Sequence, residues 1–535
     1  MVKYRKIISI PIILVIFANT FIMVAAEDSF SLSPSNETVD QLFLSSSVKQ
    51  PNAIIILNSS DKNSMQESRD YIESLGGKIR HIYPPHILIG YVPEEVSQKI
   101  ANEKNSSNSE KIIGLENIVS ISNTEIDSST LEKYEKTAVY AANAWNKNFM
   151  SVGPKDKPIS DPGPIKDYVG LPLDYEESRG SMIIHHSPPS DIETSSFMIR
   201  DISVAIIFLE SNGSIDTETE DWTTTEENNV ISEIQNGLNW WIFKEPYADI
   251  AFTYAHTSYN VPTGYEPITR PHTDENLWIT EAMNHLGYDD GEYKLRVRAY
   301  DDDIRDSDGT DWGFTIFIVD SSNDADGEFS DNDWFAYAWP NGPFSVVTYD
   351  NGGYGISHMD AVVAHETGHI FGAADQYDGA DPNCNEDSDC NATFGYLEVE
   401  NQNCERDACI SKENSIMRGG ILPFTNNNID IYAKGQVGWR DEDSDYIIDS
   451  VDHSYNPDDD TDGDSWVDYW DKCPTQSGQA GLAWGCPECT EWQQVLGCGN
   501  GGCESDEKNY TRTCLGVPES KCEYASSCES GRWGD

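Results

Sequence analysis

Short apolar runs alternate with amphipathic segments in the early part of the chain. The apolar runs favour strands, and the segments with helical spacing favour helices, one of which is closed by Gly76 and Gly77. The predicted strands include 53–57, 86–92 and 118–122, and the predicted helices are 64–75 and 94–102. We therefore expect a small α/β unit with the order β-α-β-β-α-β over residues 51–130.

A second and denser series of apolar runs begins near residue 202. Residues 226–243 carry apolar side chains at helical spacing, with threonines in front of them that can cap a helix. The predicted strands are 203–209, 249–255, 295–299, 314–319 and 344–348, and the predicted helices are 226–243 and 275–286. Interleaved strands and helices predict an α/β (α+β) domain with a mixed sheet over residues 199–440. Trp334 and Trp339 either line a cleft or, as we favour, belong to the core.

The segments around these two domains are polar or rich in proline and glycine. Residues 27–50 form a polar linker, and residues 131–198 contain repeated prolines and glycines, which favours a second linker and a place for an activation cut. Residues 1–26 have a basic start, an apolar run and small residues at the end, which is typical of an export signal. The alternative is an uncleaved signal anchor. No later segment is long and apolar enough to span a membrane, so we expect an extracellular protein.

The charge balance narrows the class of partner. The chain of 535 residues has 92 acidic and 35 basic side chains, a formal net charge of -57. Such a chain repels phosphate backbones and anionic lipid, so we expect no nucleic-acid partner. Calcium-binding loops, a saline habitat, or solubility alone would each account for the acidity.

The cysteines agree with export. All 12 lie between residues 384 and 528, and an even number in a secreted chain favours disulfides. The pairs closest in sequence are Cys384 with Cys390 and Cys404 with Cys409, although the sequence leaves the connectivity open. The C-x-x-C at 486–489 is a weaker candidate for a second zinc site.

The chemistry concentrates in one predicted helix. His365 and His369 are spaced i and i+4, so they share a helix face and can bind one metal ion. Glu366 can reach a metal-bound water, whose pKa zinc lowers towards about 7, and can accept its proton. The same carboxyl group can then return the proton to the leaving amine.

A turn after this helix supplies the third ligand. Gly372 can adopt the left-handed conformation that ends a helix, which allows Asp375 to fold back as an oxygen ligand. A fourth position stays open, as in catalytic zinc sites. Asp378 is an alternative third ligand, and His358 is a weaker candidate or an outer partner.

This arrangement resembles the metzincin clan, whose motif is H-E-x-x-H-x-x-G-x-x-H/D. The string from His365 to Tyr377 is also similar to the active-site helix of immune-inhibitor-A-type metallopeptidases. The resemblance covers about a third of the chain, and it implies a mixed-sheet upper subdomain, an active-site helix and a smaller lower subdomain. Met417, followed by two glycines two residues on, resembles the Met-turn that packs beneath the zinc ligands in that clan.

Two resemblances concern the flanking parts. The 51–130 pattern is similar to the propeptide and inhibitor modules of secreted proteases, with an ordinary α/β domain as the equal alternative. Residues 486–535 resemble a thrombospondin type 1 repeat, with Trp492 and Arg512 as the matching stacked residues. That module would imply attachment to matrix, glycan or a cell surface.

Residues 441–474 contain carboxylates at alternate positions, a pattern that can surround a calcium ion with oxygen. The second of two copies resembles the thrombospondin type 3 repeat, and the first lacks its glycine and its Cys-Pro ending. The stronger candidate ligands are Asp460, Asp462, Asp464, Asp468 and Asp471, and the weaker ones are Asp441, Asp443, Asp445, Asp449 and Asp452. An acidic linker without calcium is the alternative.

Together these features predict a secreted zinc endopeptidase made as a precursor, with zinc at the active site and structural calcium in its C-terminal modules. Its substrate would be a protein or peptide. The alternatives are a catalytically inactive, calcium-dependent adhesive surface protein and a zinc enzyme acting on a non-protein amide. No cysteine precedes His365, so no propeptide thiol in this chain can cap the zinc.

Overall fold

The computed structural model describes twelve segments of the chain. They are residues 48–58, 62–104, 112–131, 133–134, 136–150, 193–331, 334–380, 383–442, 448–451, 493–496, 507–514 and 517–524. The chain divides into two compact units, 1–49 and 50–535, and every element below belongs to the second. The predicted export signal and nearly all of the polar linker at 27–50 lie outside the described residues.

The N-terminal part of this unit has the predicted β-α-β-β-α-β order. Its elements are β1 (Ala53–Leu57), α3 (Lys62–Ser74), β2 (Lys78–Tyr83), β3 (Ile87–Tyr91), α4 (Glu94–Lys104) and β4 (Ile118–Ser122). The strands pair antiparallel in the order β4-β1-β3-β2. Their apolar residues meet α3 and α4 in one core, in which Ile55, Ile72 and Leu88 are fully buried. An α/β unit at this position is therefore confirmed.

The same sheet continues into the second domain. Its strands there are β5 (Asp201–Ser211), β6 (Ala251–Thr263), β7 (Trp312–Val319), β8 (Ala336–Ala338) and β9 (Phe344–Thr348). The nine strands lie in the order β4-β1-β3-β2-β6-β5-β7-β9-β8. Pairing is parallel from β2 to β9 and antiparallel between β9 and β8. The mixed sheet is confirmed, and it joins two regions that the sequence treats as separate domains.

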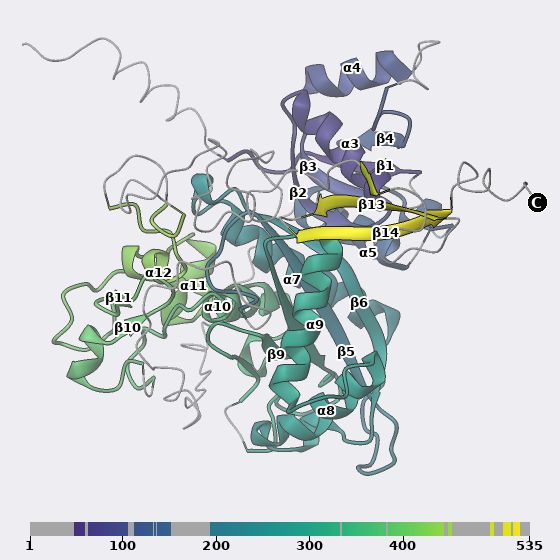
Figure 1. The fold of residues 1–535 in the computed structure, drawn as a ribbon. Helices are drawn as coiled ribbons and strands as arrows, with labels where there is room; N and C mark the ends of the chain where they lie inside the picture. The colour runs from purple at the N-terminus through teal and green to yellow at the C-terminus, as the bar shows by residue number, and fades with distance from the viewer. Residues whose placement is uncertain are drawn as a thin grey trace, which may run out of the picture. The chain divides into compact units, whose positions relative to one another are not determined.

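Helices cover both faces of the central strands (Figure 1). They are α7 (Thr224–Ile242), α8 (Glu275–Leu286), α9 (Tyr293–Asp308) and α10 (Met359–Ile370). Ala205, Ile207 and Leu209 of β5 share a core with α8 and α9. Because side chains alternate along a strand, the intervening buried residues Val204, Ile206 and Phe208 face the layer that contains α7 and α10.

Two of the helices have clear local causes. Thr223 and Glu226 form a reciprocal capping box at the start of α7, which satisfies backbone N–H groups that the first turn leaves without partners. Helix α8 has the predicted bounds and ends at Gly287, whose φ is +96°. The aromatic pair Trp334 and Trp339 packs, partly buried, against the α8–α9 core, in agreement with the core interpretation.

The strand predicted at 295–299 is wrong, because this segment belongs to α9. Over five residues, leucine, valine and alanine alternate with arginines and imitate a strand. Over the whole helix the buried positions include Val297, Tyr300 and Ile304, which recur at helical spacing, while Leu295 is 48% exposed. A window of five residues is too short to separate the two periods.

The predicted linker at 131–198 contains a helix in its first part. Helix α5 (Lys136–Trp145) continues into a short π-helical segment, Asn146–Met150. Six of its residues are buried, among them Tyr140 and Trp145, and it packs against α7. Residues 151–192 lie outside the described residues.

The remaining elements are short. They are β10 (Thr393–Phe394), β11 (Val399–Glu400), the 3-10 turn η10 (Ile416–Arg418), α11 (Ile421–Thr425), α12 (Ile431–Gln436), β12 (Gln493–Leu496), β13 (Glu507–Cys514) and β14 (Val517–Tyr524). The last three strands form an antiparallel sheet in the range predicted for the cysteine-rich module. Among the residues described, no helix has the length and apolar character needed to cross a membrane.

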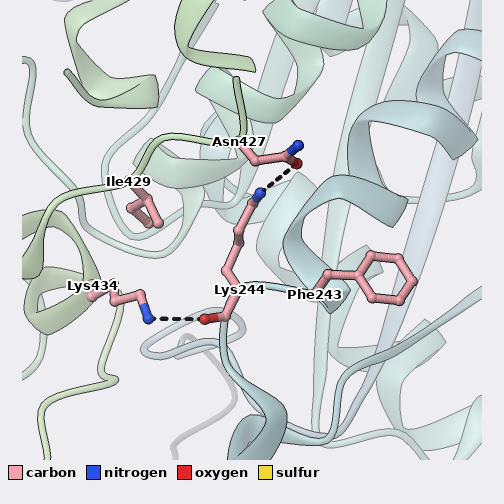
Figure 2. Close-up of a pocket in the computed structure, with 5 residues that line it drawn as sticks. All are labelled: Phe243, Lys244, Asn427, Ile429 and Lys434. Carbon is pink, nitrogen blue, oxygen red and sulfur yellow. Dashed lines mark hydrogen bonds between the residues drawn. The ribbon is translucent and has the colours of Figure 1, made fainter. Parts of the chain in front are cut away.

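A surface cavity of about 390 Å³ lies where α7 ends (Figure 2). It is lined by Phe243, Lys244, Asn427, Ile429 and Lys434. The ammonium group of Lys244 donates to Asn427 Oδ1 at 2.8 Å, and that of Lys434 donates to the Lys244 carbonyl oxygen at 2.9 Å. Burial, with a smaller effect of nearby Lys434, lowers the pKa of Lys244 to about 7. None of these lining residues is a predicted metal ligand.

Candidate metal centre

The predicted metal-binding helix is α10, and all twelve of its residues are buried. Helix α7 approaches it closely at Gly237, where a Cβ atom would lie 2.6 Å from the carbonyl oxygen of Asp360. The indole N–H of Trp241 donates to the Ala364 carbonyl oxygen at 2.8 Å. A glycine and a tryptophan on α7 therefore hold α10 in the interior.

Backbone carbonyl groups orient both histidine rings. Nδ1 of His365 lies 2.8 Å from the Ile416 carbonyl oxygen, and Nδ1 of His369 lies 2.7 Å from that of Ala373. A carbonyl oxygen can only accept, so each Nδ1 carries the ring proton. In the neutral rings, each Nε2 is then the acceptor nitrogen, the form in which histidine binds metals.

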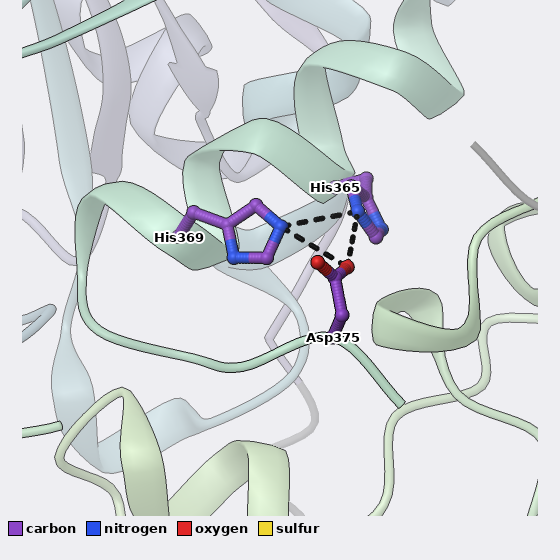
Figure 3. A group of neighbouring side chains, drawn as sticks. All are labelled: His365, His369 and Asp375. Carbon is purple, nitrogen blue, oxygen red and sulfur yellow. Dashed lines mark hydrogen bonds and ion pairs between the residues drawn. The ribbon is translucent and has the colours of Figure 1, made fainter. Parts of the chain in front are cut away.

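These two lone pairs converge on Asp375 (Figure 3). The Nε2 atoms of His365 and His369 are 3.2 Å apart, and Oδ1 of Asp375 is 3.2 Å from the first and 3.3 Å from the second. A tetrahedral zinc ion with bonds of about 2.0–2.1 Å holds neighbouring ligand atoms about 3.3 Å apart. The spacing of the three side chains therefore fits zinc. Among the described residues, they form one of the clusters whose ligand atoms lie close enough together to hold a metal ion.

The donor set also argues for a cation on chemical grounds. All three side chains are at least 95% buried. Oδ1 of Asp375 has no hydrogen-bond partner in the described part of the chain. Three acceptors that face one another without a proton between them repel, and burial strengthens that repulsion. A bound cation would remove this cost, so the cluster is a candidate metal site, and its geometry does not specify the metal.

Gly372 makes the turn that brings Asp375 back to the helix. Its φ is +86°, and its N–H donates to the His369 carbonyl oxygen at 2.8 Å, while the N–H of Ala373 donates to that of Gly368 at 2.9 Å. This pair of bonds is a Schellman motif. A Cβ atom on Gly372 would also lie 2.6 Å from Oδ1 of Asn341. The turn places the Ala373 carbonyl group against His369, so it orients two of the three ligands.

The alternative ligands lie elsewhere. Asp378 is 61% exposed at its side chain and forms an ion pair with Arg406 at 2.6 Å. His358 lies just before α10 and does not belong to the cluster of His365, His369 and Asp375. Geometry therefore favours Asp375 over Asp378 and His358 as the third ligand of the candidate site.

Met417 packs beneath the helix. A Cβ atom on Gly368 would lie 2.5 Å from its Sδ atom, so the thioether occupies the space that this glycine leaves. The Met417 carbonyl oxygen accepts from the N–H of Gln376 at 2.8 Å, and the neighbouring Ile416 carbonyl group accepts from His365. The turn η10 thereby contacts both the helix and the loop that carries the third ligand.

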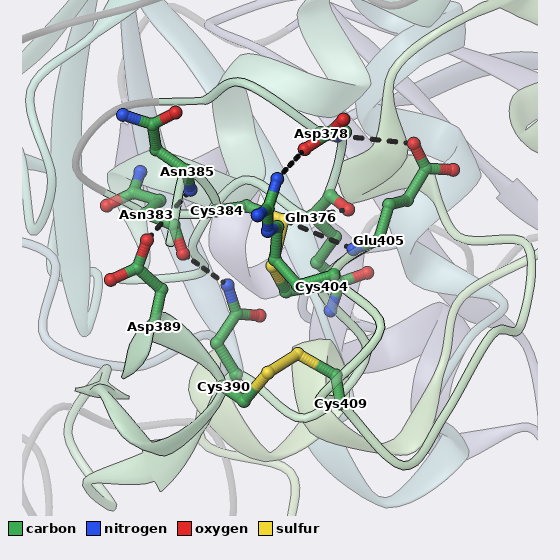
Figure 4. Close-up of a disulfide and its surroundings, with 12 residues drawn as sticks. Gln376, Asp378, Asn383, Cys384, Asn385, Asp389, Cys390, Cys404, Glu405 and Cys409 are labelled. Carbon is green, nitrogen blue, oxygen red and sulfur yellow. Dashed lines mark hydrogen bonds and ion pairs between the residues drawn. A yellow bond between two sulfur atoms is a disulfide. The ribbon is translucent and has the colours of Figure 1, made fainter. Parts of the chain in front are cut away.

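Two disulfides pin the loop after Asp375 (Figure 4). They join Cys384 to Cys404 and Cys390 to Cys409. The connectivity that the sequence left open is therefore not that of nearest neighbours, because both bridges cross between the two cysteine clusters. These four cysteines form disulfides, and the side chains of the other eight lie outside the described part of the chain.

The first disulfide is coupled to the metal ligand through short contacts. Sγ of Cys384 lies 3.4 Å from the Gln376 carbonyl oxygen, which also accepts from the N–H of Glu405 at 2.9 Å. The amide of Asn401 donates to the carbonyl oxygens of Asp375 and Asn383, at 2.8 and 3.0 Å. The sequence did not identify Asn401, because a buried asparagine 26 residues from its partner has no local signature.

We predict that the two disulfides differ in their effect on metal binding. The Cys384→Ser/Cys404→Ser protein should bind zinc about 10–100-fold more weakly, the range typical of lost outer contacts to metal ligands. The Cys390→Ser/Cys409→Ser protein is the matched control. The cysteines of this disulfide are separated by 19 residues and those of the first by 20, so the two disulfides restrict the unfolded chain to a similar extent. Competition with a zinc-binding dye measures both. Equal losses would show that the first disulfide only stabilises the fold.

Glu366 follows His365 on α10 and is 1% exposed. Its carboxyl group is therefore held in the same interior as the metal ligands, on a helix fixed from several sides. A buried carboxylate beside a metal centre can act as a proton acceptor and donor for a bound substrate.

The calcium candidates are only partly covered. Eight of the ten candidates lie outside the described residues: Asp460, Asp462, Asp464, Asp468, Asp471, Asp443, Asp445 and Asp452. Asp449 is described, and its carboxylate pairs with Arg440 and accepts from the backbone N–H of Glu442 at 2.9 Å. Whether Asp449 also binds calcium stays a prediction from the sequence. Asp441 also belongs to the described residues, and it is not part of any cluster there that could hold a metal ion.

The three ligands and Glu366 lie within residues 365–375, while the groups that orient them come from distant parts of the chain. The candidate metal site thus rests on its own geometry and chemistry. A scan of the sequence against known protein families finds no matching family, and a search of curated proteins likewise finds no match.

Proposed function

We propose that this protein is a secreted, zinc-dependent endopeptidase. The observation that carries the proposal is the convergence of two histidine Nε2 atoms and one carboxylate oxygen at 3.2–3.3 Å, with Glu366 next to the first ligand. Three protein ligands leave a fourth position for substrate or water, which is typical of catalytic zinc. When bound, zinc supplies Lewis acidity that polarises a carbonyl group and makes water more acidic.

The chain's own residues have distinct tasks in this proposal. His365, His369 and Asp375 hold the metal, and the carbonyl groups of Ile416 and Ala373 keep the two rings in the required tautomer. The Glu366 carboxylate accepts a proton from the attacking water and passes it to the leaving amine. Burial excludes bulk water and strengthens each of these electrostatic interactions.

The competing proposals differ in what they ask of this site. An inactive adhesive protein does not need a buried glutamate beside a complete ligand set, so the combination favours an enzyme. A zinc enzyme for a non-protein amide would use the same residues, and only substrate tests separate it from a peptidase. Calcium in the C-terminal modules, and their attachment to matrix or glycan, remain proposals from the sequence.

A direct test uses the purified full-length chain with casein and gelatin. We expect cleavage that is lost on treatment with a zinc chelator and restored by added zinc. Zinc binding at one equivalent without cleavage of any peptide substrate would contradict the peptidase and favour the adhesive protein. Hydrolysis of small amides alone would favour the third alternative.

A further inference from the structure

The N-terminal α/β unit and the domain that carries the metal centre share one sheet. Strand β2 pairs in parallel with β6, with His81 opposite Phe252 and Ile82 opposite Thr253. Strand β6 pairs on its other side with β5, next to the layer of α7 and α10. Backbone pairing of this kind makes the two parts continuous, in contrast to domains that touch only through side chains.

A buried ion pair lies at this junction. The guanidinium group of Arg69, on α3, donates to both carboxylate oxygens of Asp201, at 2.6 and 2.8 Å. The two residues are 8% and 7% exposed. This bidentate ion pair is favourable only while both partners are present. Substitution of one partner would leave the other charge buried without compensation. Lys78 and Arg80 on β2 add ion pairs to Asp249, at 2.8 and 2.9 Å.

Uncharged contacts also lie at this junction. Nδ1 of His81 lies 3.0 Å from the hydroxyl group of Tyr254, and its Nε2 lies 3.0 Å from Oδ1 of Asn239. Tyr83 stacks on Tyr254 with ring centroids 4.6 Å apart. Burial lowers the pKa of His81 to about 4, so the ring is neutral at neutral pH. Buried aromatic residues at the centre of an interface are typical of positions that contribute strongly to binding.

Helix α5 extends the contact along α7. Lys136 forms an ion pair with the carboxylate of Glu227, which also accepts a hydrogen bond from the hydroxyl group of Tyr140. The amide of Asn148 donates to the Ser232 carbonyl oxygen at 2.8 Å, and Lys147 pairs with Glu233 at 2.5 Å. Loss of the N-terminal part would thus remove these cations from the carboxylates of Asp201, Glu227 and Glu233, all three of which are buried while it is bound.

We infer that residues 50–150 are a permanent, non-covalent partner of the domain that carries the metal centre, and that they stay bound after the chain is cut within residues 151–192. The docking surface on that domain consists of the β6 edge at Phe252 and Thr253, Asp201, Asp249 and the α5-facing side of α7. Release of residues 50–150 would have to break the β2–β6 strand pairing and these ion pairs together, and it would uncover the buried ring of Tyr254. The inference does not depend on the proposed peptidase activity.

The test uses the full-length chain with the recognition sequence of a specific protease inserted between residues 151 and 192. After purification the chain is cut, and the products are separated by gel filtration in native buffer. We expect both fragments to elute together and to separate only in denaturant. Elution of the N-terminal fragment by itself in native buffer would overturn the inference.

Matched variants test the contacts. Arg69→Ala in the cut protein should raise the dissociation rate of the N-terminal fragment by at least about 30-fold, as expected when one member of a buried charge pair is removed. Lys99→Ala, at an exposed position on α4, is the control and should leave the rate unchanged. If Arg69→Ala prevents folding, Lys136→Ala on α5 should give a smaller increase. Rates for both interface variants equal to that of Lys99→Ala would contradict the proposed docking surface.

Discussion

Replacement of Glu366 by glutamine is expected to lower kcat for peptide hydrolysis by about 10²–10⁴-fold, the usual contribution of a general acid–base group. Glutamine has almost the same shape as glutamate but cannot accept the proton. The residue is 1% exposed, so solvent water does not readily substitute for the lost carboxylate. Steady-state kinetics with a quenched fluorescent peptide measure the effect.

Metal content is the companion measurement for this variant. Because Glu366 is not among the three converging ligands, the Glu366→Gln protein should retain about one zinc per chain. Glu281→Gln, on α8 in the opposite layer, is the matched control and should keep full activity. A Glu366→Gln protein that keeps its zinc and loses less than about 10-fold in kcat would contradict the assigned role.

Replacement of Asp375 by asparagine should have the second large effect, on metal affinity. Lost outer contacts to a metal ligand cost about 10–100-fold in affinity, so loss of the anionic ligand itself should cost more than about 100-fold. Oδ1 of Asp375 is the oxygen that lies 3.2–3.3 Å from both Nε2 atoms, and no described hydrogen-bond donor can replace a metal there. Zinc titration against a competing dye gives the affinity.

Asp378→Asn is the control that decides between the two ligands considered from the sequence. Its side chain is 61% exposed and pairs with Arg406, so zinc affinity should not change. Loss of zinc from Asp378→Asn with retention in Asp375→Asn would reverse the assignment. The two large effects are also separable, because Glu366→Gln should lose turnover with its metal and Asp375→Asn should lose the metal.

Helices with complete patterns were predictable from the sequence, and shorter or mixed patterns were not. The 226–243 and 275–286 segments carry full amphipathic repeats with caps or a closing glycine, and α7 and α8 appear there. Alternation over 295–299 was too short to reveal α9. Strand β8, with three residues, was missed because strands of this length have almost no periodic signal.

The pairing of distant segments also escaped prediction. The parallel contact of β2 with β6 joins two regions that each read as an independent domain. Prolines and glycines in 131–198 indicated a linker, but its first part forms α5 because Tyr140 and Trp145 find a surface on α7 to pack against. The local composition of a segment indicates whether it favours a loop. It contains no information about a distant surface against which the segment can pack.

The sequence by itself determined the local part of the candidate metal site. This part consists of the last turns of one helix and the turn that follows it, with His365, Glu366, His369, Gly372 and Asp375. Helical spacing and the conformational freedom of glycine were therefore sufficient to predict that these residues lie close together. Tertiary structure decided which groups orient these residues, how the cysteines pair, and that the N-terminal unit shares the sheet. Nδ1 of His365 meets a carbonyl oxygen 51 residues away, and Arg69 meets Asp201 across 132 residues. Every residue has a carbonyl group, so only the packing of the chain selects the one that a histidine meets.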